Sequence, residues 1–307
     1  METVIQLHHL SKSFKGVETV SNVNMNVKKG EIYGFLGPNG AGKTTIMKMI
    51  LNLVKPTSGD IKICNQSIST TSYQYLSKIG SIIEYPEFYE RLSAKENLEL
   101  HCEYVGVYEK GAVKEALDIV GLDGVENKKI HEFSLGMKQR LGIARAIVTK
   151  PEILILDEPI NGLDPIGIKD IRELLMLLKE EHGITILISS HIVSEVESIA
   201  DTIGILHHGQ LLKEVRMDDI RKENMEYLEI KIDDAKKAIH VLENKLGIRK
   251  YEIVNQHCLR IFEHDISQSQ INKELILNNI AVNGIEKQQQ HLEEYFLNLI
   301  NGGNQIA

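Results

Sequence analysis

Residues 37–44 read Gly37-Pro38-Asn39-Gly40-Ala41-Gly42-Lys43-Thr44, between a short apolar run and a stretch of helical composition. This sequence fits the phosphate-binding pattern G-x-x-x-x-G-K-[ST]. Its glycines let backbone N–H groups turn inward around a polyphosphate, where a β-carbon would obstruct the approach. In this pattern Lys43 neutralises the β- and γ-phosphates and the Thr44 hydroxyl holds Mg²⁺. We therefore expect a strand, a loop and a helix that bind a nucleoside triphosphate, with Thr45 completing the loop contacts.

An acidic pair follows a second apolar run. The strand-length segment Ile153–Leu156 is followed directly by Asp157 and Glu158. The carboxyl ends of parallel strands share one edge of a sheet, so both acids are expected beside the phosphate loop. There Asp157 can hold Mg²⁺ together with Thr44, and Glu158 can polarise an attacking water. An acidic turn after a core strand also occurs without function, and the upstream phosphate loop favours the catalytic interpretation.

Buried strands alternate with helical segments through the middle of the chain. A stripe of apolar residues indicates a helix around residues 168–178, and an apolar run predicts a buried strand at 184–188. The first 30 residues alternate apolar and polar side chains, which is typical of half-exposed strands. Further helices are expected at Ser93–Val105, Val113–Val120 and Ser134–Val148. The pattern predicts an α/β fold with a mostly parallel sheet and helices on both faces.

The composition argues against several other classes of protein. A net charge of -8 disfavours nucleic-acid binding, which usually needs a basic face. Cys64, Cys102 and Cys258 are far apart and lack metal-ligand spacing, so neither a disulfide framework nor a zinc site is expected. No apolar run approaches the ~20 residues that span a bilayer. We expect a soluble chain in a reducing cytoplasm.

The segment before the acidic strand resembles the signature of a known family. Residues 133–140 read Phe133-Ser134-Leu135-Gly136-Met137-Lys138-Gln139-Arg140, which is similar to the ABC signature Leu-Ser-Gly-Gly-Gln followed by a basic helix start. Phe133, Leu135 and Met137 depart from that pattern, whereas Ser134 and Gly136 keep it. Ser134 can cap the helix and direct its hydroxyl to a phosphate, and Gly136 allows close backbone approach.

Other ABC motifs follow in the family order. The sequence Asn161-Gly162-Leu163-Asp164 resembles the D-loop, His191 the switch histidine that contacts the γ-phosphate, and Phe14 the aromatic residue that stacks on adenine. Alone, Phe14 would more often be a core residue and His191 a polar residue at a strand end. With the phosphate loop and the acidic pair, they make residues 1–216 similar to an ABC nucleotide-binding domain.

This resemblance implies a fold, cofactors and partners. The fold would be a P-loop NTPase with a parallel core, an antiparallel β subdomain and a helical subdomain at about residues 86–149. ATP and Mg²⁺ would be bound, and Glu158 and His191 would act in hydrolysis. Two copies would pair head to tail, each ATP lying between one phosphate loop and the other copy's Ser134, Leu135, Gly136 and Met137. Integral membrane permease subunits would be the partners, at the cytoplasmic side of the membrane.

Glu84 stands where many members of this family carry a glutamine that contacts the metal and lies against the membrane subunit. A glutamate can offer oxygen to Mg²⁺, but it adds negative charge near the γ-phosphate and cannot donate a hydrogen bond as an amide does. We expect Glu84 to couple the site to a partner, unless it is simply solvated. Tyr85, Phe88 and Tyr89 follow, as core residues or as anchors for a partner helix.

Residues 217–307 differ from the preceding residues in their pattern of apolar and polar segments. Segments between Leu228 and Ile285 predict the order β-α-β-β-α-β of a small ferredoxin-like α+β unit, and Leu292–Ile300 predicts a last amphipathic helix. This extension, the Glu84 region and the signature together resemble the ATP-binding subunits of bacitracin-resistance and lantibiotic-immunity exporters. The resemblance implies expulsion of a membrane-active peptide antibiotic from a Gram-positive bacterium.

Other functions stay open at this point. An ABC-2-type exporter ATPase could serve a different cargo. A soluble ABC ATPase acting on DNA or ribosomes usually carries two cassettes or a long coiled coil, and here one cassette is present without a heptad run. A nucleotide sensor that does not hydrolyse ATP would be expected to lack the base, whereas Glu158 and His191 are both present.

Overall fold

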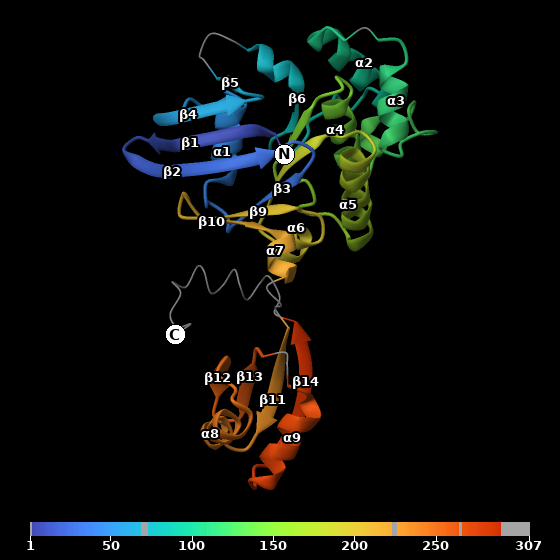
Figure 1. Cartoon of the computed structure of the whole chain (residues 1–307). Helices are drawn as coiled ribbons and strands as arrows, with labels where there is room; N and C mark the ends of the chain where they lie inside the picture. The colour runs from blue at the N-terminus through green and yellow to red at the C-terminus, as the bar shows by residue number, and fades with distance from the viewer. Residues whose placement is uncertain (1, 69–72, 108, 223–225, 264–265, 290–307) are drawn as a thin grey trace. The chain divides into compact units, whose positions relative to one another are not determined.

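The computed structural model describes residues 2–68, 73–107, 109–222, 226–263 and 266–289. The chain divides into two compact units, Met1–Met217 and Asp218–Ala307 (Figure 1). Among the described residues, no helix combines the length and the apolar character needed to cross a membrane.

A six-stranded sheet with the order β10-β9-β3-β8-β7-β6 forms the centre of the first unit. Neighbouring strands from β9 to β6 run parallel, and β10 pairs antiparallel with β9. Three of these strands are buried along their whole length because both faces of the sheet are covered, which explains their largely apolar sequences. The strands are β3 (Ile32–Leu36), β6 (Ile79–Ile82), β7 (Ile153–Leu156), β8 (Thr185–Ser190), β9 (Thr202–His207) and β10 (Gln210–Arg216).

An antiparallel sheet with the order β2-β1-β4-β5 packs on one face of the central sheet. A single hydrophobic cluster joins them: it contains Leu7 and Met25 from the antiparallel strands, Met47 from helix α1, and Phe35 and Ile155 from the central strands. Helix α1, which follows the phosphate loop, therefore contacts both sheets. These elements are β1 (Thr3–Phe14), β2 (Val17–Lys28), α1 (Lys43–Ile50), β4 (Ser58–Ile63) and β5 (Gln66–Ser67).

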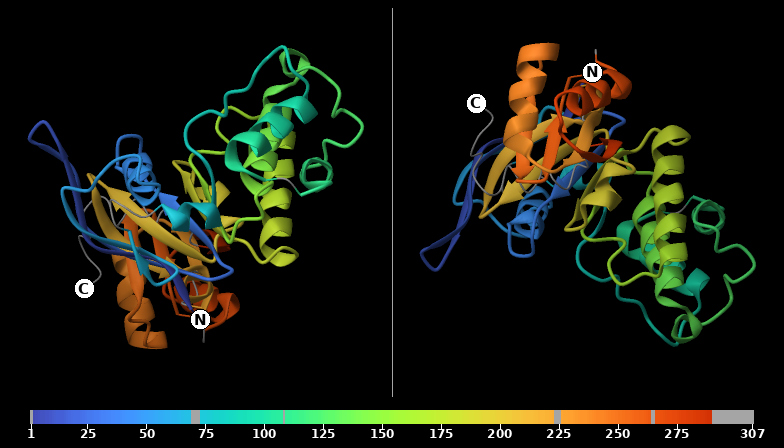
Figure 2. Two further views of the ribbon diagram at one scale, coloured as in Figure 1. Left: turned by 90° about the horizontal axis from the view of Figure 1, so that it is seen from above. Right: turned by 90° about the horizontal axis from the view of Figure 1, so that it is seen from below.

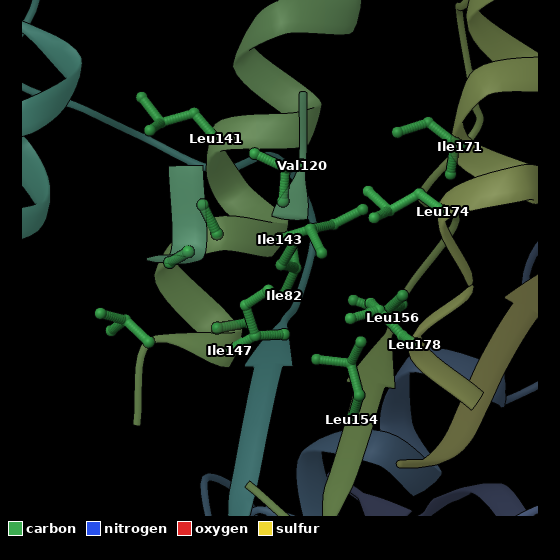
Figure 3. Close-up of a cluster of buried hydrophobic side chains, with 14 of the residues drawn as sticks. Ile82, Val120, Leu141, Ile143, Ile147, Leu154, Leu156, Ile171, Leu174 and Leu178 are labelled. Atoms are coloured by element: carbon green, nitrogen blue, oxygen red, sulfur yellow. The ribbon is translucent and has the colours of Figure 1, made fainter. Parts of the chain in front are cut away.

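Helices cover the opposite face of the central sheet. Successive side chains of β7 point to opposite faces, so Leu154 and Leu156 leave the first cluster and join a second one with α4 and α5. Figure 3 shows Leu156 beside Leu174 and Leu178 of α5 in this second cluster. The green segment with α2, α3 and α4 stands to one side of the strands in Figure 2. The helices of the first unit are α2 (Ala94–Val105), α3 (Ala112–Ile119), α4 (Leu135–Ile147), α5 (Pro165–Glu180) and α6 (Val193–Glu197), with short 3-10 turns at Gln74–Lys78 and Ile130–Glu132. Helix α7 (Met217–Lys222) begins at the last residue of this unit.

The second unit contains an antiparallel four-stranded sheet in the order β12-β13-β11-β14. Its helices share one hydrophobic cluster with Ile230 and Leu259 of the sheet. Asp234 caps the start of α8, and Gly247 adopts the left-handed conformation at its end. The elements are β11 (Glu226–Ile232), α8 (Ala235–Leu246), β12 (Tyr251–Asn255), β13 (Cys258–Ile261), α9 (Gln268–Leu277) and β14 (Val282–Gln289).

The parallel core, the antiparallel sheet and the separate helical group confirm the predicted fold class. The structure also contains β4, β5, β6, β9 and β10, which the sequence did not predict as strands. The amphipathic helix predicted at Leu292–Ile300 lies outside the described residues.

Candidate functional site

The phosphate loop leaves the carboxyl end of β3 and leads directly into α1. A β-carbon added at Gly37 would lie 2.3 Å from the carbonyl oxygen of Leu206, so the neighbouring strand leaves no room for a side chain there. Gly40 and Gly42 have φ values of 81° and 106°, a region that favours glycine. The loop is thus a backbone cradle that opens at the amino end of α1, where helix N–H groups favour anions.

Lys43 lies inside this cradle and is only 5% exposed. Its ammonium group donates to the carbonyl oxygens of Gly37, at 2.6 Å, and Pro38, at 3.2 Å. It also lies 3.2 Å from Glu158 Oε1. The loop therefore holds a buried cation whose partners are two backbone oxygens and the second acid of the Asp157-Glu158 pair.

Asp157 connects three elements at the carboxyl edge of the sheet. Thr44 Oγ1 donates to Asp157 Oδ2 at 2.7 Å, and Ser189 Oγ donates to Asp157 Oδ1 at 2.6 Å. Asp157 itself is 4% exposed. The hydroxyl of Thr44 and the carboxylate of Asp157 together form a set of hard oxygen donors, the chemistry that Mg²⁺ prefers.

Glu158 is held by contacts on its backbone and on both side-chain oxygens. Its φ of 49° lies in the left-handed region, and its N–H donates to Ser189 Oγ at 2.9 Å. Its Oε1 faces Lys43, and its Oε2 lies 2.8 Å from His191 Nδ1. The structure thus brings the predicted base and the predicted switch histidine into direct contact.

Sequence reasoning missed the two serines at the end of β8. Ser189 is fully buried and contacts both acids, as described above. Ser190 Oγ donates to Glu195 at 2.9 Å and accepts the Ile192 N–H at 3.0 Å, which shapes the turn that contains His191. Burial raises the pKa of Glu195, while the Ser190 hydroxyl opposes that rise. The available signal was a pair of hydroxyl residues directly before His191, at the end of a strand beside β7.

Phe14 lies at the end of β1 with 44% of its surface exposed, so it is not a core residue. The ammonium group of Lys12 lies 4.8 Å from the centre of its ring. An exposed aromatic face that attracts a cation is also available for stacking on a planar base. Its contact with adenine stays a prediction.

The signature segment faces a separate hollow of about 390 Å³. Ser134 caps α4 by accepting the Met137 N–H at 3.3 Å, and Asp164 caps α5 by accepting the Gly167 N–H at 2.8 Å. A β-carbon added at Gly136 would meet no atom closer than 4.0 Å. Ser134, Leu135, Gly136 and Asp164 line the hollow, and Leu135 is 43% exposed.

Glu84 forms an ion pair instead of joining the oxygen donors around Asp157. Its Oε1 lies 2.7 Å from Lys48 Nζ, and this contact lowers the pKa of the Glu84 carboxyl. Its φ of 64° marks a tight turn after β6. The predicted contact between Glu84 and a metal stays a prediction.

The loop that begins at Glu84 is attached to α4 at its far end. Arg145 Nη1 donates to the carbonyl oxygen of Glu87 at 2.7 Å, and its guanidinium lies 4.8 Å from the centre of the Phe88 ring. Glu90 pairs with Lys138 at 2.7 Å. Residues 84–90 therefore join the phosphate-loop helix to the helix that follows the signature.

Two protein-family models match parts of this chain. Residues 20–161 match the family model described as ABC transporter. Residues 126–197 also match a model described as an AAA domain, putative AbiEii toxin, Type IV TA system. The first match contains the phosphate loop, the signature and both acids.

Three curated relatives extend the likeness. The chain is 55% identical to an uncharacterized ABC transporter ATP-binding protein, YcbN of Bacillus subtilis, over 99% of each chain. It is 47% identical to the bacitracin transport ATP-binding protein BcrA of Bacillus licheniformis, again over 99% of each. It is 46% identical to the lantibiotic transport ATP-binding protein SrtF of Streptococcus pyogenes, over 73% of this chain and 95% of that one.

The fold of this chain is also similar to that of a solved ATP-binding cassette. The ATP-binding cassette MJ0796, a dimer in a post-hydrolysis state bound to ADP and phosphate, superposes with a TM-score of 0.62 at 29% identity. The match covers 69% of this chain and 98% of that one.

Proposed function

Because this chain belongs to the ATP-binding, ATP-hydrolysing proteins of ABC transporters, we propose that it energises export of a peptide antibiotic through separate membrane subunits. The proposed cargo rests on the similarity to the bacitracin transport protein over 99% of both chains. The lantibiotic relative matches over only 73% of this chain. Bacitracin-type peptides are therefore the first cargo to test and lantibiotics the second.

Mg²⁺ is the metal that fits the donor set. Thr44 Oγ1 and Asp157 Oδ2 already lie 2.7 Å apart, and both are hard oxygen atoms beside the phosphate cradle. When bound, the ion would neutralise charge on the phosphates. Glu84 is the proposed third oxygen donor from the protein.

Hydrolysis is assigned to Glu158 and His191. The Glu158 carboxylate can accept a proton from the attacking water, and Ser189 fixes its backbone in place. His191 contacts Glu158 and orients the carboxylate from the opposite side to Lys43. Lys43 already occupies the cradle, so it is placed to exchange its carbonyl partners for phosphate oxygens.

A second copy of the chain is the proposed partner at the nucleotide. Leu135 and Ile166 are exposed at the rim of the signature hollow, and Gly136 leaves space for a ligand. Ser134 caps a helix whose N-terminal end favours an anion. We infer a head-to-tail dimer in which this hollow closes over the ATP of the other copy.

The surface around residues 84–90 is the proposed dock for a membrane permease subunit. Tyr85 and Tyr89 are 64% and 57% exposed, so their rings are accessible to a partner helix. The protein would then lie peripherally at the cytoplasmic side of the membrane. Residues 1–216 form the proposed nucleotide-binding domain, and the strand order of the second unit supports a ferredoxin-like C-terminal domain, at residues 217–307, of unassigned role.

The cargo is tested in a bacitracin-sensitive Gram-positive host that carries the permease genes of the same transporter. Expression of the chain is expected to raise the inhibitory concentration of bacitracin, and the Glu158→Gln variant is expected to give no protection at equal abundance. Nisin-type and unrelated peptides are measured in parallel. Equal sensitivity with and without the active chain, for every peptide, would overturn the proposed cargo class.

A further inference from the structure

The backbone places Glu84 next to the catalytic strand. Ile82 pairs with Leu156 in the sheet, and the Ile82 carbonyl accepts the Asp157 N–H at 2.9 Å. Glu84 follows two residues later, where a φ of 64° turns the chain away from the strand. Glu84 thus follows a direct backbone partner of Asp157 by two residues, while its carboxylate contacts Lys48.

Lys48 determines where that carboxylate lies. It follows Thr44 by four residues on α1, so both side chains share one face of the helix, with ~6 Å between their β-carbons. Thr44 Oγ1 contacts Asp157, whereas Lys48 Nζ contacts Glu84 Oε1. One face of α1 thus contacts two carboxylates. The Thr44 hydroxyl contacts Asp157, and one turn further along the helix the Lys48 ammonium contacts Glu84.

The identity of residue 84 explains why a cation is needed there. A glutamine is neutral and can turn toward phosphates without adding charge, whereas a glutamate brings a full negative charge. Lys48 is 31% exposed at its side chain, so it offsets this charge without the cost of deep burial.

We propose that Lys48 is a positioning residue that holds Glu84 one helical turn from the Thr44–Asp157 pair and competes with Mg²⁺ for the Glu84 carboxylate. Glu84 would reach the metal only after this ion pair opens. The inference deepens the proposed function and rests on the metal site proposed there. Because the Lys48–Glu84 pair is partly exposed to solvent, we expect the competition to be modest, about two- to fivefold in affinity.

The test separates metal binding from turnover. In a Glu158→Gln background, ATP affinity is measured by isothermal titration calorimetry in excess Mg²⁺ and in excess EDTA, and the ratio of the two affinities is the readout. This ratio cancels any direct attraction between Lys48 and the phosphates. Lys48→Gln, Glu84→Gln and the double variant are compared, with Lys169→Gln as control because Lys169 forms an exposed pair with Glu173 on α5.

We expect the effect of Lys48→Gln on this affinity ratio to depend on whether residue 84 is glutamate or glutamine. Lys48→Gln should raise the ratio about two- to fivefold while residue 84 is glutamate, and should leave it unchanged once residue 84 is glutamine. In the nucleotide-free protein, Lys48→Gln should also raise the pKa of the Glu84 carboxyl toward its ordinary value in an NMR titration. Lys169→Gln should change neither quantity.

Two results would overturn the inference. One is an unchanged ratio for Lys48→Gln, and the other is an equal shift with glutamate and with glutamine at position 84. A parent protein whose ATP affinity is the same in Mg²⁺ and EDTA would refute the metal site itself, which distinguishes that failure from a failure of Lys48.

Discussion

The phosphate-loop region and the signature region of the first unit differ in how many contacts their own residues make. Around the phosphate loop, Thr44 donates to Asp157 at 2.7 Å and Lys43 lies 3.2 Å from Glu158, so these residues satisfy one another in pairs. Around the signature, Ser134 and Asp164 cap their own helices and line a hollow. One region is ordered by its own contacts, whereas the other presents apolar and glycine surface.

The difference indicates which of the two regions could act in a single copy of the chain and which would need a second copy. A buried network with fixed partners can bind phosphate in a single copy because its groups are already placed. An exposed rim with Leu135 and Ile166 has surface to bury only when something covers it. We therefore expect changes in the phosphate-loop region to affect chemistry directly, and changes in the signature region to act through a second copy.

The largest effect is expected from Glu158→Gln. The amide keeps the size of the side chain but cannot accept the proton, so ATPase turnover should fall by about 100- to 10,000-fold. ATP binding should remain, and dimers should accumulate during size-exclusion chromatography with ATP. Phosphate release at the parent rate would show that another group is the base.

Gly136→Asp is expected to be next in size. The structure has room for a β-carbon there, so the protein should fold, but a carboxylate would face the phosphates of the other copy. ATPase activity should fall about 10- to 100-fold, as expected when electrostatic stabilisation at a phosphoryl site is lost. ATP binding by the monomer should be unaffected, and Gly136→Ala is the matched control for size.

Mixing two defective variants sharpens this test. A Lys43→Ala copy keeps an intact signature, and a Gly136→Asp copy keeps an intact phosphate loop. A mixed dimer would contain one intact composite site, so the mixture should hydrolyse more ATP than either variant alone. Activity that is only the average of the two would count against shared sites.

Ser189→Ala is expected to have an intermediate effect. It removes one partner from Asp157, in a buried contact, and one from the Glu158 N–H, in a partly buried contact. The free energy of unfolding should fall by about 1–3 kcal/mol, measured by urea denaturation. Turnover should fall about tenfold with a smaller change in ATP affinity, since a tenfold loss corresponds to ~1.4 kcal/mol in the barrier. Ser190→Thr serves as a neighbouring control that keeps its hydroxyl.

The smallest effect is expected from Lys138→Ala near the signature. Its pair with Glu90 is partly solvated, so the free energy of unfolding should fall by less than ~1 kcal/mol. A double-mutant cycle with Glu90→Ala measures the pair itself. A coupling larger than this would mean that the attachment of residues 84–90 to α4 is more than a surface contact.

Local sequence was sufficient for the parts of the site that lie within one turn or one strand end. The phosphate loop and the Asp157-Glu158 pair depend on neighbouring residues, and the resemblance to a family supplied the signature. The sequence did not predict the contacts of Ser189 and Lys48, because their partners Asp157 and Glu84 lie 32 and 36 residues away along the chain. Such contacts are fixed by the packing of β7 against β8 and of α1 against the loop after β6.

Strands with polar sequences were the hardest part of the fold to predict. The apolar segment at residues 280–285 predicts a strand, whereas β14 continues through Glu286 and Lys287 to Gln289. Its pairing with β11 uses backbone hydrogen bonds, which need no particular side chain. Strand β9 was missed for a different reason: it is largely buried but contains Gly204, packed beside Tyr33, and a glycine weakens the strand signal in a sequence.

The loop of residues 84–90 has unequal attachments at its two ends. At α4 it is secured by a guanidinium that binds the backbone and covers an aromatic ring. At α1 it depends on two flexible side chains of opposite charge, at 31% and 66% exposure. In the proposed transporter, a force applied at Tyr85 would therefore act on the more easily released end, so the loop would pivot about Arg145 and move Glu84 relative to the phosphate-loop helix.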